Sequence, residues 1–353
     1  MDITKIDKNF KMNEGAEFQS NGNAFNIPCK PFLLKGGFYD EKDGFIRMPL
    51  DYAKKVSQSV YTLSSNTAGI RVLFSTNSNI IKIKAKLPYK CVFPHMTPIA
   101  SMGFTLVEVV DGEEKYVSNF IPPQEGDEMV TSCDLKGGVV RDYIFYFPLY
   151  ASVSSLTFEF EDGAKIYEYD KYRKIAPILY YGSSITQGGC ASKASNTYQS
   201  YLSEWLNVDY INLGFSGSAK GEQAICEYLS NIDCSVFVCD YDCNAPSVEH
   251  LKETHYKLYE TFRSNPKQKN TPIIFLTRPS MFWRVDCKSF EKVIVETYKK
   301  AIANGDKNVY LIKGANYYPK EVREHCYIDG VHPNDLGFYF MAKSIYKVLK
   351  KLV

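Results

Sequence analysis

The sequence predicts two domains, an antiparallel β-sandwich followed by a doubly wound α/β domain. Between about residues 30 and 170, apolar and polar residues alternate with period two, as they do in strands with one buried face. From about Ile175 onward, short continuous apolar runs alternate with helical stretches, which is typical of a parallel sheet covered on both faces. The charged, tyrosine-rich segment Tyr167–Lys174 separates the two patterns. We therefore place the sandwich in residues 1–172 and the α/β domain in residues 173–353.

The first domain contains three clear candidate strands, which are Ile81–Leu87, Phe104–Val110 and Leu156–Glu161. An Asp-Gly dipeptide follows each of the last two, at residues 111–112 and 162–163. Asp-Gly after an alternating run predicts a hairpin, because the tight turn needs positive φ. Helical periodicity is weak here, and only a short helix near Tyr52–Ser57 is expected.

The second domain repeats a strand, loop and helix pattern five times. Its expected strands are Ile178–Tyr181, Tyr210–Leu213, Val236–Cys239, Ile273–Leu276 and Val309–Ile312. Its expected helices lie near Tyr198–Leu206, Glu222–Leu229, Val248–Arg263 and Phe290–Ala303, and after the capping segment Pro333-Asn334-Asp335. In such sheets ligands bind beyond the carboxyl ends of the strands, so the loops that follow those ends are where a site is expected.

Charge and composition exclude several classes of function. The 353 residues include 42 basic and 40 acidic side chains, a balance that argues against electrostatic binding of nucleic acid or of an anionic membrane. No stretch approaches the roughly 18 consecutive apolar residues that span a bilayer. The segment Met1–Asp7 lacks the basic and apolar pattern of a secretory signal, so a cytoplasmic location is expected.

The 10 cysteines are accordingly expected to be reduced. Cys234, Cys239 and Cys243 lie in or beside an apolar run and, with His250, are a possible metal site. The spacing C-x3-C-x6-H matches none of the common zinc patterns, so burial as free thiols is favoured. No metal or organic cofactor is expected.

The loop after the first parallel strand reads Gly182-Ser183-Ser184-Ile185-Thr186-Gln187-Gly188-Gly189. A small hydroxyl at this place can act as a nucleophile if a base lies beside it. Two other interpretations remain open: the serines cap the next helix, or the turn binds phosphate. The segment has neither the P-loop ending, nor the G-x-G-x-x-G spacing, nor the G-x-S-x-G elbow.

A base for this serine is offered by His332, which follows Asp329 by three residues in the loop before the final helix. At that spacing on a turn, the carboxylate can hold the Nδ1–H of the imidazole and leave Nε2 free to accept a proton. An Asp and a His at this spacing are by themselves a weak signal of a catalytic pair. Their position after the fifth strand, just before the final helix, strengthens that interpretation. His250 and His255 lie on an expected amphipathic helix, where packing is the more common role.

Donors for a developing oxyanion are available on two further loops. Residues 212–219 contain Gly214 and Gly217, whose backbone can approach a reacting centre closely, and residues 240–246 contain the amide side chain of Asn244. Arg278, just past the fourth strand, has two possible uses, contact with substrate or an ion pair with a loop carboxylate; we favour the ion pair. The sandwich segments 94–96 and 101–104 offer a possible wall of the cleft, which the sequence does not distinguish from loop packing.

Taken together, the four loops resemble the SGNH (GDSL-like) hydrolase family, named for the Ser, Gly, Asn and His of four sequence blocks. The residues that match the blocks are, in order, Ser184, Gly217, Asn244, and Asp329 with His332. The resemblance covers about residues 175–353. It implies a three-layer α/β/α, flavodoxin-like catalytic domain, with Ser184, His332 and Asp329 as the triad. It also implies an oxyanion hole formed by the backbone N–H groups of Ser184 and Gly217 and the side chain of Asn244.

The sequence departs from the family pattern at two places. Ser183 stands where the family has Asp, and Ala245 stands where its G-x-N-D block has Asp. These changes argue against the well-known lipase branches and are similar to a branch in which a jelly-roll-like β-sandwich precedes the hydrolase domain. We expect Ser183 to be structural.

The resemblance implies a serine esterase that hydrolyses small acyl esters, most plausibly O-acetyl groups on a carbohydrate, through an acyl-enzyme. The alternatives are an acyltransferase that uses a small-molecule alcohol, or an acylhydrolase of the lipase or thioesterase type. The expected partner is a small polar ester, with no nucleic acid and no membrane. A homo-oligomer is left open.

Overall fold

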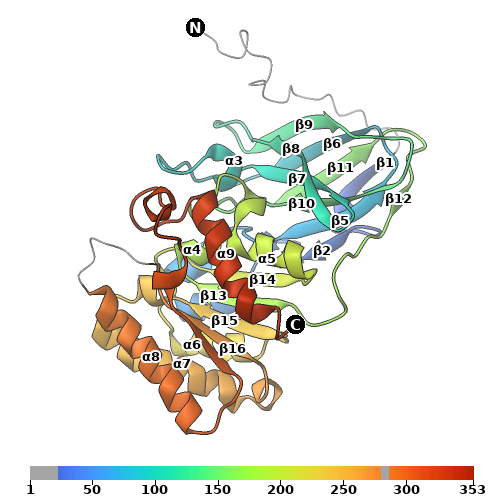
Figure 1. Ribbon diagram of the computed structural model, residues 1–353. Helices are drawn as coiled ribbons and strands as arrows, with labels where there is room; N and C mark the ends of the chain where they lie inside the picture. Colours follow the sequence, from blue (N-terminus) through green and yellow to red (C-terminus); the bar gives the residue numbers. More distant parts are fainter. Residues whose placement is uncertain (1–22, 280–285) are drawn as a thin grey trace.

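The computed structural model describes residues 23–279 and 286–353, and Figure 1 shows their arrangement. The segment Met1–Asp7, used above for the signal-peptide argument, lies outside the described residues. Two antiparallel sheets lie at the amino-terminal side, and a parallel sheet with helices on both faces follows (Figure 1). The predicted fold class is therefore confirmed. The boundary at residues 172 and 173 stays a prediction.

The sandwich consists of one four-stranded and one six-stranded sheet. The first has the order β1 (Asn23–Ile27), β11 (Ser155–Phe160), β6 (Ile80–Lys86) and β9 (Glu128–Asp134). The second has the order β12 (Ile166–Tyr167), β5 (Arg71–Thr76), β10 (Arg141–Tyr146), β7 (Phe104–Val110) and β8 (Glu113–Phe120), with β2 (Leu33–Lys35) paired to β5. In β6, Ile81, Ile83 and Ala85 are buried while Lys84 and Lys86 are exposed, so the alternation read from the sequence is that of a half-buried strand.

The two Asp-Gly turns have different outcomes. Asp111 and Gly112 both have positive φ and join β7 to its antiparallel neighbour β8, so this hairpin prediction is confirmed. The hairpin predicted at residues 162–163 is wrong. Gly163 has positive φ, but the strand that follows, β12, pairs with β5 in the other sheet. The turn transfers the chain between sheets because the neighbours of β11 are already β1 and β6.

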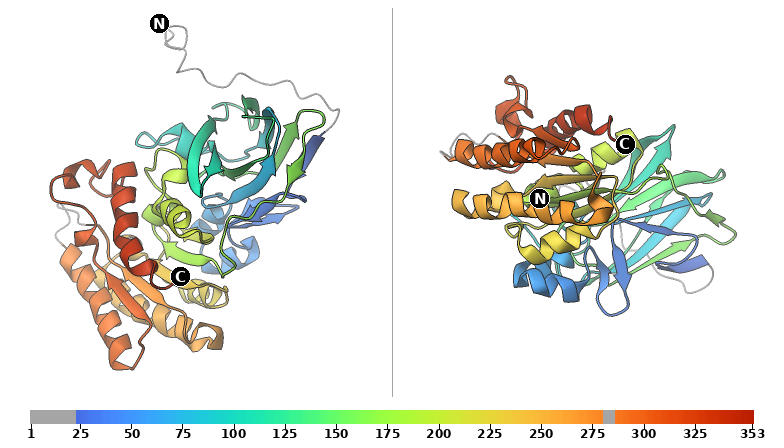
Figure 2. Two further views of the ribbon diagram at one scale, coloured as in Figure 1. Left: turned by 45° about the vertical axis from the view of Figure 1, so that its right-hand side comes forward. Right: turned by 90° about the horizontal axis from the view of Figure 1, so that it is seen from below.

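The first part of the chain also contributes helices. The short helix expected near Tyr52–Ser57 is a pair, α1 (Leu50–Val56) and α2 (Gln58–Ser64), which follows the β3 (Phe38–Asp40) and β4 (Gly44–Ile46) hairpin. Ser57 separates the two helices and caps the second, because its side chain accepts a hydrogen bond from Val60 N–H. Both helices pack beside the α/β domain rather than on the sandwich (Figure 2), and Ala53 and Val60 are buried in that domain's core.

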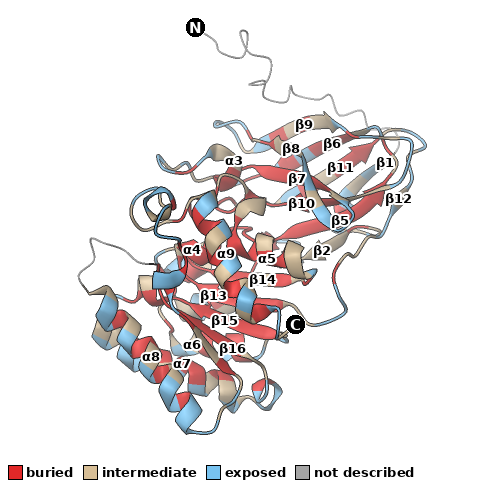
Figure 3. Cartoon of the chain, in the orientation of Figure 1, coloured by how far each residue is buried: buried red, intermediate tan, exposed pale blue. Residues whose placement is uncertain are grey.

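The α/β domain contains five parallel strands in the order β14 (Tyr210–Gly214), β13 (Ile178–Gly182), β15 (Val236–Asp240), β16 (Ile273–Leu276) and β17 (Val309–Ile312). Its helices are α4 (Ser184–Gln187), α5 (Tyr198–Leu206), α6 (Gln223–Ser230), α7 (Val248–Ser264), α8 (Cys287–Ala303) and α9 (Asp335–Leu349). Alternate strand residues face two separate cores, one with α5 and α9 and the other with α6, α7 and α8. Burial on both faces explains the continuous apolar runs in the sequence, and Figure 3 shows the strands buried beneath half-exposed helices.

The sandwich and the α/β domain share one apolar core. Leu73 and Ile144 of the sandwich belong to the same buried cluster as Ile178 and Tyr210 of the parallel sheet. The loop helix α3 (Pro98–Ser101) lies near this contact, because Tyr150 N–H donates to Ser101 O at 2.9 Å. The two domains therefore hold each other in a fixed relation.

Two fully buried arginines reinforce the contact between domains. Arg47 donates four hydrogen bonds to main-chain carbonyls, two of them on β14, at Asn212 and Gly214. Arg71 donates to Asp209 and stacks on the ring of Tyr210, 3.8 Å from its centroid. Such buried cations are stable only when their donors are satisfied.

None of the 10 cysteines, all of which the structure describes, forms a disulfide. Over the residues that the structure describes, no helix combines the length and the apolar character that crossing a bilayer requires. The cytoplasmic location stays a prediction.

Candidate active site

Ser184 lies at the carboxyl end of β13, as the first residue of the short helix α4. The preceding Gly182 has no room for a side chain, because an added Cβ would lie 2.4 Å from the Asp240 carbonyl oxygen and 2.1 Å from Thr186 Oγ1. Ser183 caps α4, since its hydroxyl accepts a hydrogen bond from Ile185 N–H at 3.2 Å. The tight turn thus buries Ser183 and leaves the hydroxyl of Ser184 at the edge of the sheet.

Ser184 and His332 meet although 148 residues separate them. Ser184 Oγ lies 2.8 Å from His332 Nε2, and His332 Nδ1 lies 2.7 Å from Asp329 Oδ2. The loop that carries the pair is closed by a bridge between Tyr327 and Pro333. The structure therefore places Ser184, His332 and Asp329 in one hydrogen-bonded chain, the Ser184 relay.

Asp329 is held as a carboxylate. Partial burial raises the pKa of this group, but hydrogen bonds from the His332 amide, the His332 imidazole and the Val331 amide outweigh burial and lower the pKa below its usual range. Because the ionised carboxylate accepts from Nδ1, the imidazole presents the lone pair of Nε2 to Ser184.

Besides the Ser184 amide, the predicted oxyanion donors lie in the loops that follow β14 and β15. Gly217 has a φ of 67°, in the left-handed region that favours glycine, and a Cβ there would meet nothing within 4 Å. Within the described ranges, neither the Ser184 amide nor the Gly217 amide donates to a protein acceptor. Asn244 donates one N–H to Phe215 O at 2.9 Å, which directs its amide toward the Gly217 loop and leaves its second N–H available.

The Gly217 loop is tied to the sandwich by Gln187. Its side-chain oxygen accepts from Ser216 N–H at 3.0 Å, and its side-chain nitrogen donates to Asn66 Oδ1 and Leu149 O, both at 3.1 Å. All three contacts of this buried amide are satisfied. Sequence analysis did not single out Gln187, because a glutamine in a loop carries no signal of such a role.

Arg278 forms the ion pair that we favoured. Its backbone N–H and its Nε both donate to Asp242 Oδ2 at 3.1 Å, and the guanidinium stacks on Phe290, 3.9 Å from the ring centroid. The side chain is 2% exposed. Arg278 thereby anchors the loop that carries Asn244, and its contact with substrate stays a prediction.

Of the two sandwich segments weighed as a wall of the cleft, the first lies at the site. The ring of His95 lies 6.0 Å from the ring of His332, and Phe93 packs between His95 and Tyr150. The second segment is core, since Met102 and Phe104 are fully buried. The sequence did not distinguish the two, because neither segment carries a pattern beyond that of an ordinary loop.

The other two histidines considered are structural. His250 Nε2 lies 2.8 Å from Lys220 O. His255 is buried, contacts Thr297 Oγ1 at 2.9 Å and stacks on Tyr241. Neither approaches the Ser184 relay, and the Cys239, Cys243 and His250 set forms no cluster among the described residues.

Because His255 is buried, the folded protein is expected to lose stability in acid. Burial lowers the pKa of this imidazole to about 3, from the ordinary value of 6.5. Between these values the unfolded chain binds a proton that the folded protein does not. The contribution of His255 to the free energy of unfolding is therefore constant above pH 6.5 and falls as the pH decreases toward 3, by up to about 1.4 kcal/mol per pH unit. Urea unfolding at several pH values should show a shallower slope for His255→Asn, and equal slopes would contradict the assignment.

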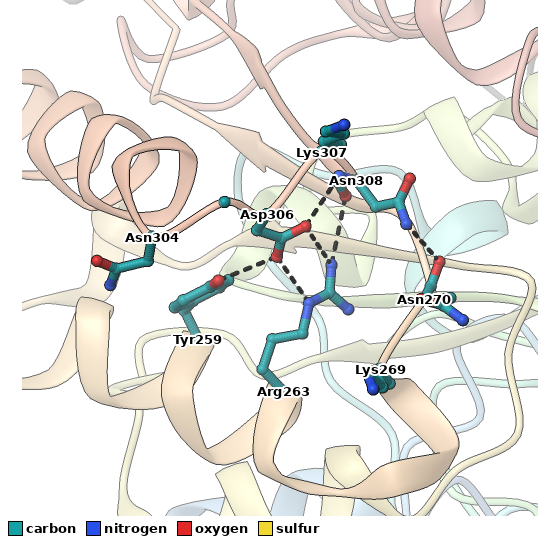
Figure 4. Close-up of a pocket in the computed structure, with 9 residues that line it drawn as sticks. Tyr259, Arg263, Lys269, Asn270, Asn304, Asp306, Lys307 and Asn308 are labelled. Atoms are coloured by element: carbon teal, nitrogen blue, oxygen red, sulfur yellow. Dashed lines mark hydrogen bonds and ion pairs between the residues drawn. The ribbon is translucent and has the colours of Figure 1, made fainter.

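A polar hollow of about 390 Å³ lies at the opposite edge of the sheet (Figure 4). It borders the amino ends of β16 and β17, and its central carboxylate, Asp306, accepts from Tyr259 and Arg263 at 2.9 and 2.7 Å. These groups satisfy one another, and none of them faces the Ser184 relay. The hollow is therefore not the candidate active site.

Comparisons with known proteins identify the family of each domain. Residues 175–350 match the GDSL-like Lipase/Acylhydrolase family, and residues 25–166 match the N-terminus of the SGNH-hydrolase-type esterases. No curated protein matches.

Solved structures resemble the chain over both domains. A Bacteroides ovatus protein described as a GDSL-like lipase is 29% identical, with a TM-score of 0.83 over 94% of this chain and 98% of that one. The salicylyl-acyltransferase SsfX3 from a tetracycline biosynthetic pathway is 16% identical, with a TM-score of 0.77 over 93% and 97%. A family two carbohydrate esterase from Clostridium thermocellum, in complex with cellohexaose, is 15% identical, with a TM-score of 0.61 over 81% and 93%.

Proposed function

We propose that this chain, which belongs to the GDSL-like lipase/acylhydrolase family and is an esterase, hydrolyses small acyl esters through Ser184, His332 and Asp329. The observation that carries the proposal is the continuous contact from Ser184 Oγ to His332 Nε2, at 2.8 Å, and from His332 Nδ1 to Asp329 Oδ2, at 2.7 Å. That order of nucleophile, base and orienting carboxylate is what acyl transfer by serine requires.

The mechanism has two steps. His332 Nε2 accepts the Ser184 proton as Oγ attacks the ester carbonyl, and the alcohol leaves with that proton to give an acyl-enzyme. His332 then accepts a proton from the water that attacks the acyl-enzyme. As the bond from the acyl carbon to Ser184 Oγ breaks, His332 returns that proton to Oγ, which releases the acid and restores the free enzyme. In both steps the amides of Ser184 and Gly217 and the free N–H of Asn244 stabilise the oxyanion. No step needs a metal or an organic cofactor.

The substrate that we propose is an O-acetylated carbohydrate. A sugar is supported by the fold that the chain shares with a family two carbohydrate esterase in complex with cellohexaose. A near-balanced charge of +2 agrees with a polar, uncharged ligand. A small acyl group is preferred to a long chain because the sequence departs from the lipase pattern at Ser183 and Ala245.

An acyltransferase is the second candidate. It is favoured by the similarity to the salicylyl-acyltransferase SsfX3 over nearly the whole of both chains. In that case an acceptor alcohol, rather than water, would attack the acyl-enzyme.

One set of assays tests these proposals. A fluorophosphonate probe should label wild type at Ser184, identified by peptide mass, and an unlabelled Ser184 would exclude an active nucleophile. Acetate release should then be measured across acetylated mono- and oligosaccharides, with p-nitrophenyl esters of increasing chain length to expose a lipase or thioesterase preference. Turnover that depends on an added alcohol more than on water would favour the acyltransferase.

Gln187→Met is expected to lower kcat by about tenfold with little change in KM, because it frees Ser216 and the Gly217 amide from their fixed position. Gln268→Met is the matched control, since Gln268 is an equally buried amide whose contacts with Ser230 O and Ile232 O lie away from the relay. Both variants should lose stability, and only Gln187→Met should lose kcat. A similar kcat for the two variants would argue against this role.

A further inference from the structure

Three metal-binding side chains meet beside the Ser184 relay. The ligand atoms of His95, Cys190 and His332 all lie within 4.8 Å of one another. Within residues 23–279 and 286–353, they are the one group of three or more His, Cys, Asp or Glu side chains placed in this way. The hydrolytic mechanism uses His332 and assigns nothing to the other two.

The hydrogen bond between His332 and Asp329 determines which ring nitrogen of His332 can bind a metal ion. Its Nδ1 is engaged with Asp329, so Nε2 carries the lone pair. A Cβ built on Gly189 would lie 3.4 Å from His332 Cδ2, the ring atom next to Nε2, and Cys190 follows Gly189 directly. The edge of the imidazole that bears the lone pair therefore faces the segment that carries the thiol.

Cys190 has an unusual backbone conformation. Its φ is 76°, in the left-handed region that residues other than glycine seldom adopt. Backbone strain of this kind persists where the surrounding structure imposes it, and it is concentrated at functional sites. Here it accompanies a buried thiol at the edge of the candidate active site.

His95 reaches the cluster from the other domain. It lies in the loop between β6 and α3, its side chain is exposed, and its ring centroid is 6.0 Å from that of His332. An exposed side chain can rotate with little cost, whereas Cys190 and His332 are held by the α/β domain. The sandwich thus supplies the mobile ligand of the three.

We propose that His95, Cys190 and His332 form a His₂Cys site for a soft divalent cation such as Zn²⁺, which inhibits the esterase while it is bound. Two imidazole nitrogens and one thiolate are ligands that Zn²⁺ prefers, and water or a substrate oxygen completes the tetrahedron. Asp329 then acts as the outer carboxylate that orients a metal-bound histidine.

The distances allow the site with a small movement. Zn–N and Zn–S bonds of about 2.1 and 2.3 Å place neighbouring tetrahedral ligands about 3.5 Å apart. Ligand atoms within 4.8 Å must therefore approach by up to about 1.3 Å. Rotation of the exposed His95 supplies this for its own two contacts, and the Cys190 side chain must turn toward His332 for the third. The Ser184 hydroxyl, 2.8 Å from Nε2, must turn away to admit the cation.

Binding and catalysis exclude each other. As the cation binds, the Cys190 thiol releases its proton to solvent and His332 Nε2 donates its lone pair to the metal. The same lone pair is the acceptor for the Ser184 proton, so the metal-bound enzyme has no general base. The inhibitory part of this inference rests on the proposed function, whereas metal binding does not.

Metal binding is tested first, with the metal alone and without any ester. Co²⁺ added to the Ser184→Ala variant should produce the absorption of thiolate-to-cobalt charge transfer, with tetrahedral d–d bands. His95→Ala and Cys190→Ser, each added to that variant, should weaken Co²⁺ binding by at least about tenfold. His325→Ala and Cys133→Ser, which alter a histidine and a cysteine outside the cluster, should leave it unchanged. A cobalt spectrum without the thiolate band, or equal binding by all variants, would overturn the site.

Inhibition is measured next, against acetate release by the otherwise unaltered enzyme. Zn²⁺ should inhibit reversibly, with activity restored by a chelator, and His95→Ala should raise the inhibitory concentration by at least about tenfold relative to its own zinc-free rate. Because His95 is exposed, this variant is expected to fold even if Cys190→Ser does not. Zinc inhibition of equal strength in His95→Ala would contradict the inference, while an enzyme that binds Co²⁺ but hydrolyses no ester would contradict only the proposed function.

Discussion

Ser184→Ala is expected to lower kcat/KM for ester hydrolysis by at least about a hundredfold, because it removes the atom that forms the acyl-enzyme. The Ser184 amide, the Gly217 amide and Asn244 remain, so KM should change much less than kcat. The measurement is acetate release from the best substrate of the carbohydrate screen, together with p-nitrophenyl acetate.

Ser183→Ala is the matched control for Ser184→Ala. Ser183 is the adjacent, buried serine, and its hydroxyl caps α4 rather than reaching His332. Its loss should cost about 1 kcal/mol of stability, with a far smaller loss of activity than Ser184→Ala. Equal rates in wild type and Ser184→Ala would reject the proposed triad, and an equal loss in both serine variants would indicate damage to the turn instead.

Arg47→Met is expected to lower the free energy of unfolding by at least about 3 kcal/mol, because four hydrogen bonds to buried carbonyls are lost at once. The acceptors belong to both domains, and two of them lie on β14 immediately before the Gly217 loop. Activity per folded molecule should fall as well. Urea unfolding and esterase assays of the same preparation separate the two effects.

Arg47→Lys tests whether charge or shape matters. Burial lowers the pKa of the Arg47 guanidinium to about 9, and a lysine ammonium keeps the charge but reaches fewer of the four carbonyls. We therefore expect Arg47→Lys to be nearly as destabilised as Arg47→Met. If Arg47→Lys were as stable as wild type, the positive charge, and not the planar arrangement of the guanidinium N–H groups, would stabilise the contact between the two domains.

The sequence predicted the α/β domain closely because its signals are local. The first parallel strand was expected at Ile178–Tyr181 and spans Ile178–Gly182, since a continuous apolar run followed by Gly-Ser-Ser ends a buried strand without ambiguity. Ser184, Asp329 and His332 could be proposed because they stand in loops whose place at one edge of the sheet follows from the strand order.

The features that the sequence did not predict depend on contacts between segments that lie far apart in the chain. The burial of Arg47 could not be predicted from the sequence, because arginine side chains usually lie at the surface. His95 lies in a loop of the other domain, and only the packing of the sandwich against the parallel sheet brings it to His332. The turn at Asp162 and Gly163 has the local chemistry of a hairpin, but the sheet into which its second strand enters is decided by which neighbours are already occupied.

Asp329 and His332 keep their positions relative to each other when their loop moves, because both lie in one seven-residue loop that is bridged at Tyr327 and Pro333. A displacement of that loop would preserve the carboxylate–imidazole contact and change a single coordinate, the gap between Nε2 and the serine hydroxyl. Switching such an enzyme on or off therefore requires control of one distance of 2.8 Å rather than reassembly of three groups. Directed evolution of this scaffold could adjust turnover from residues outside the loop while the tautomer of the base stays fixed.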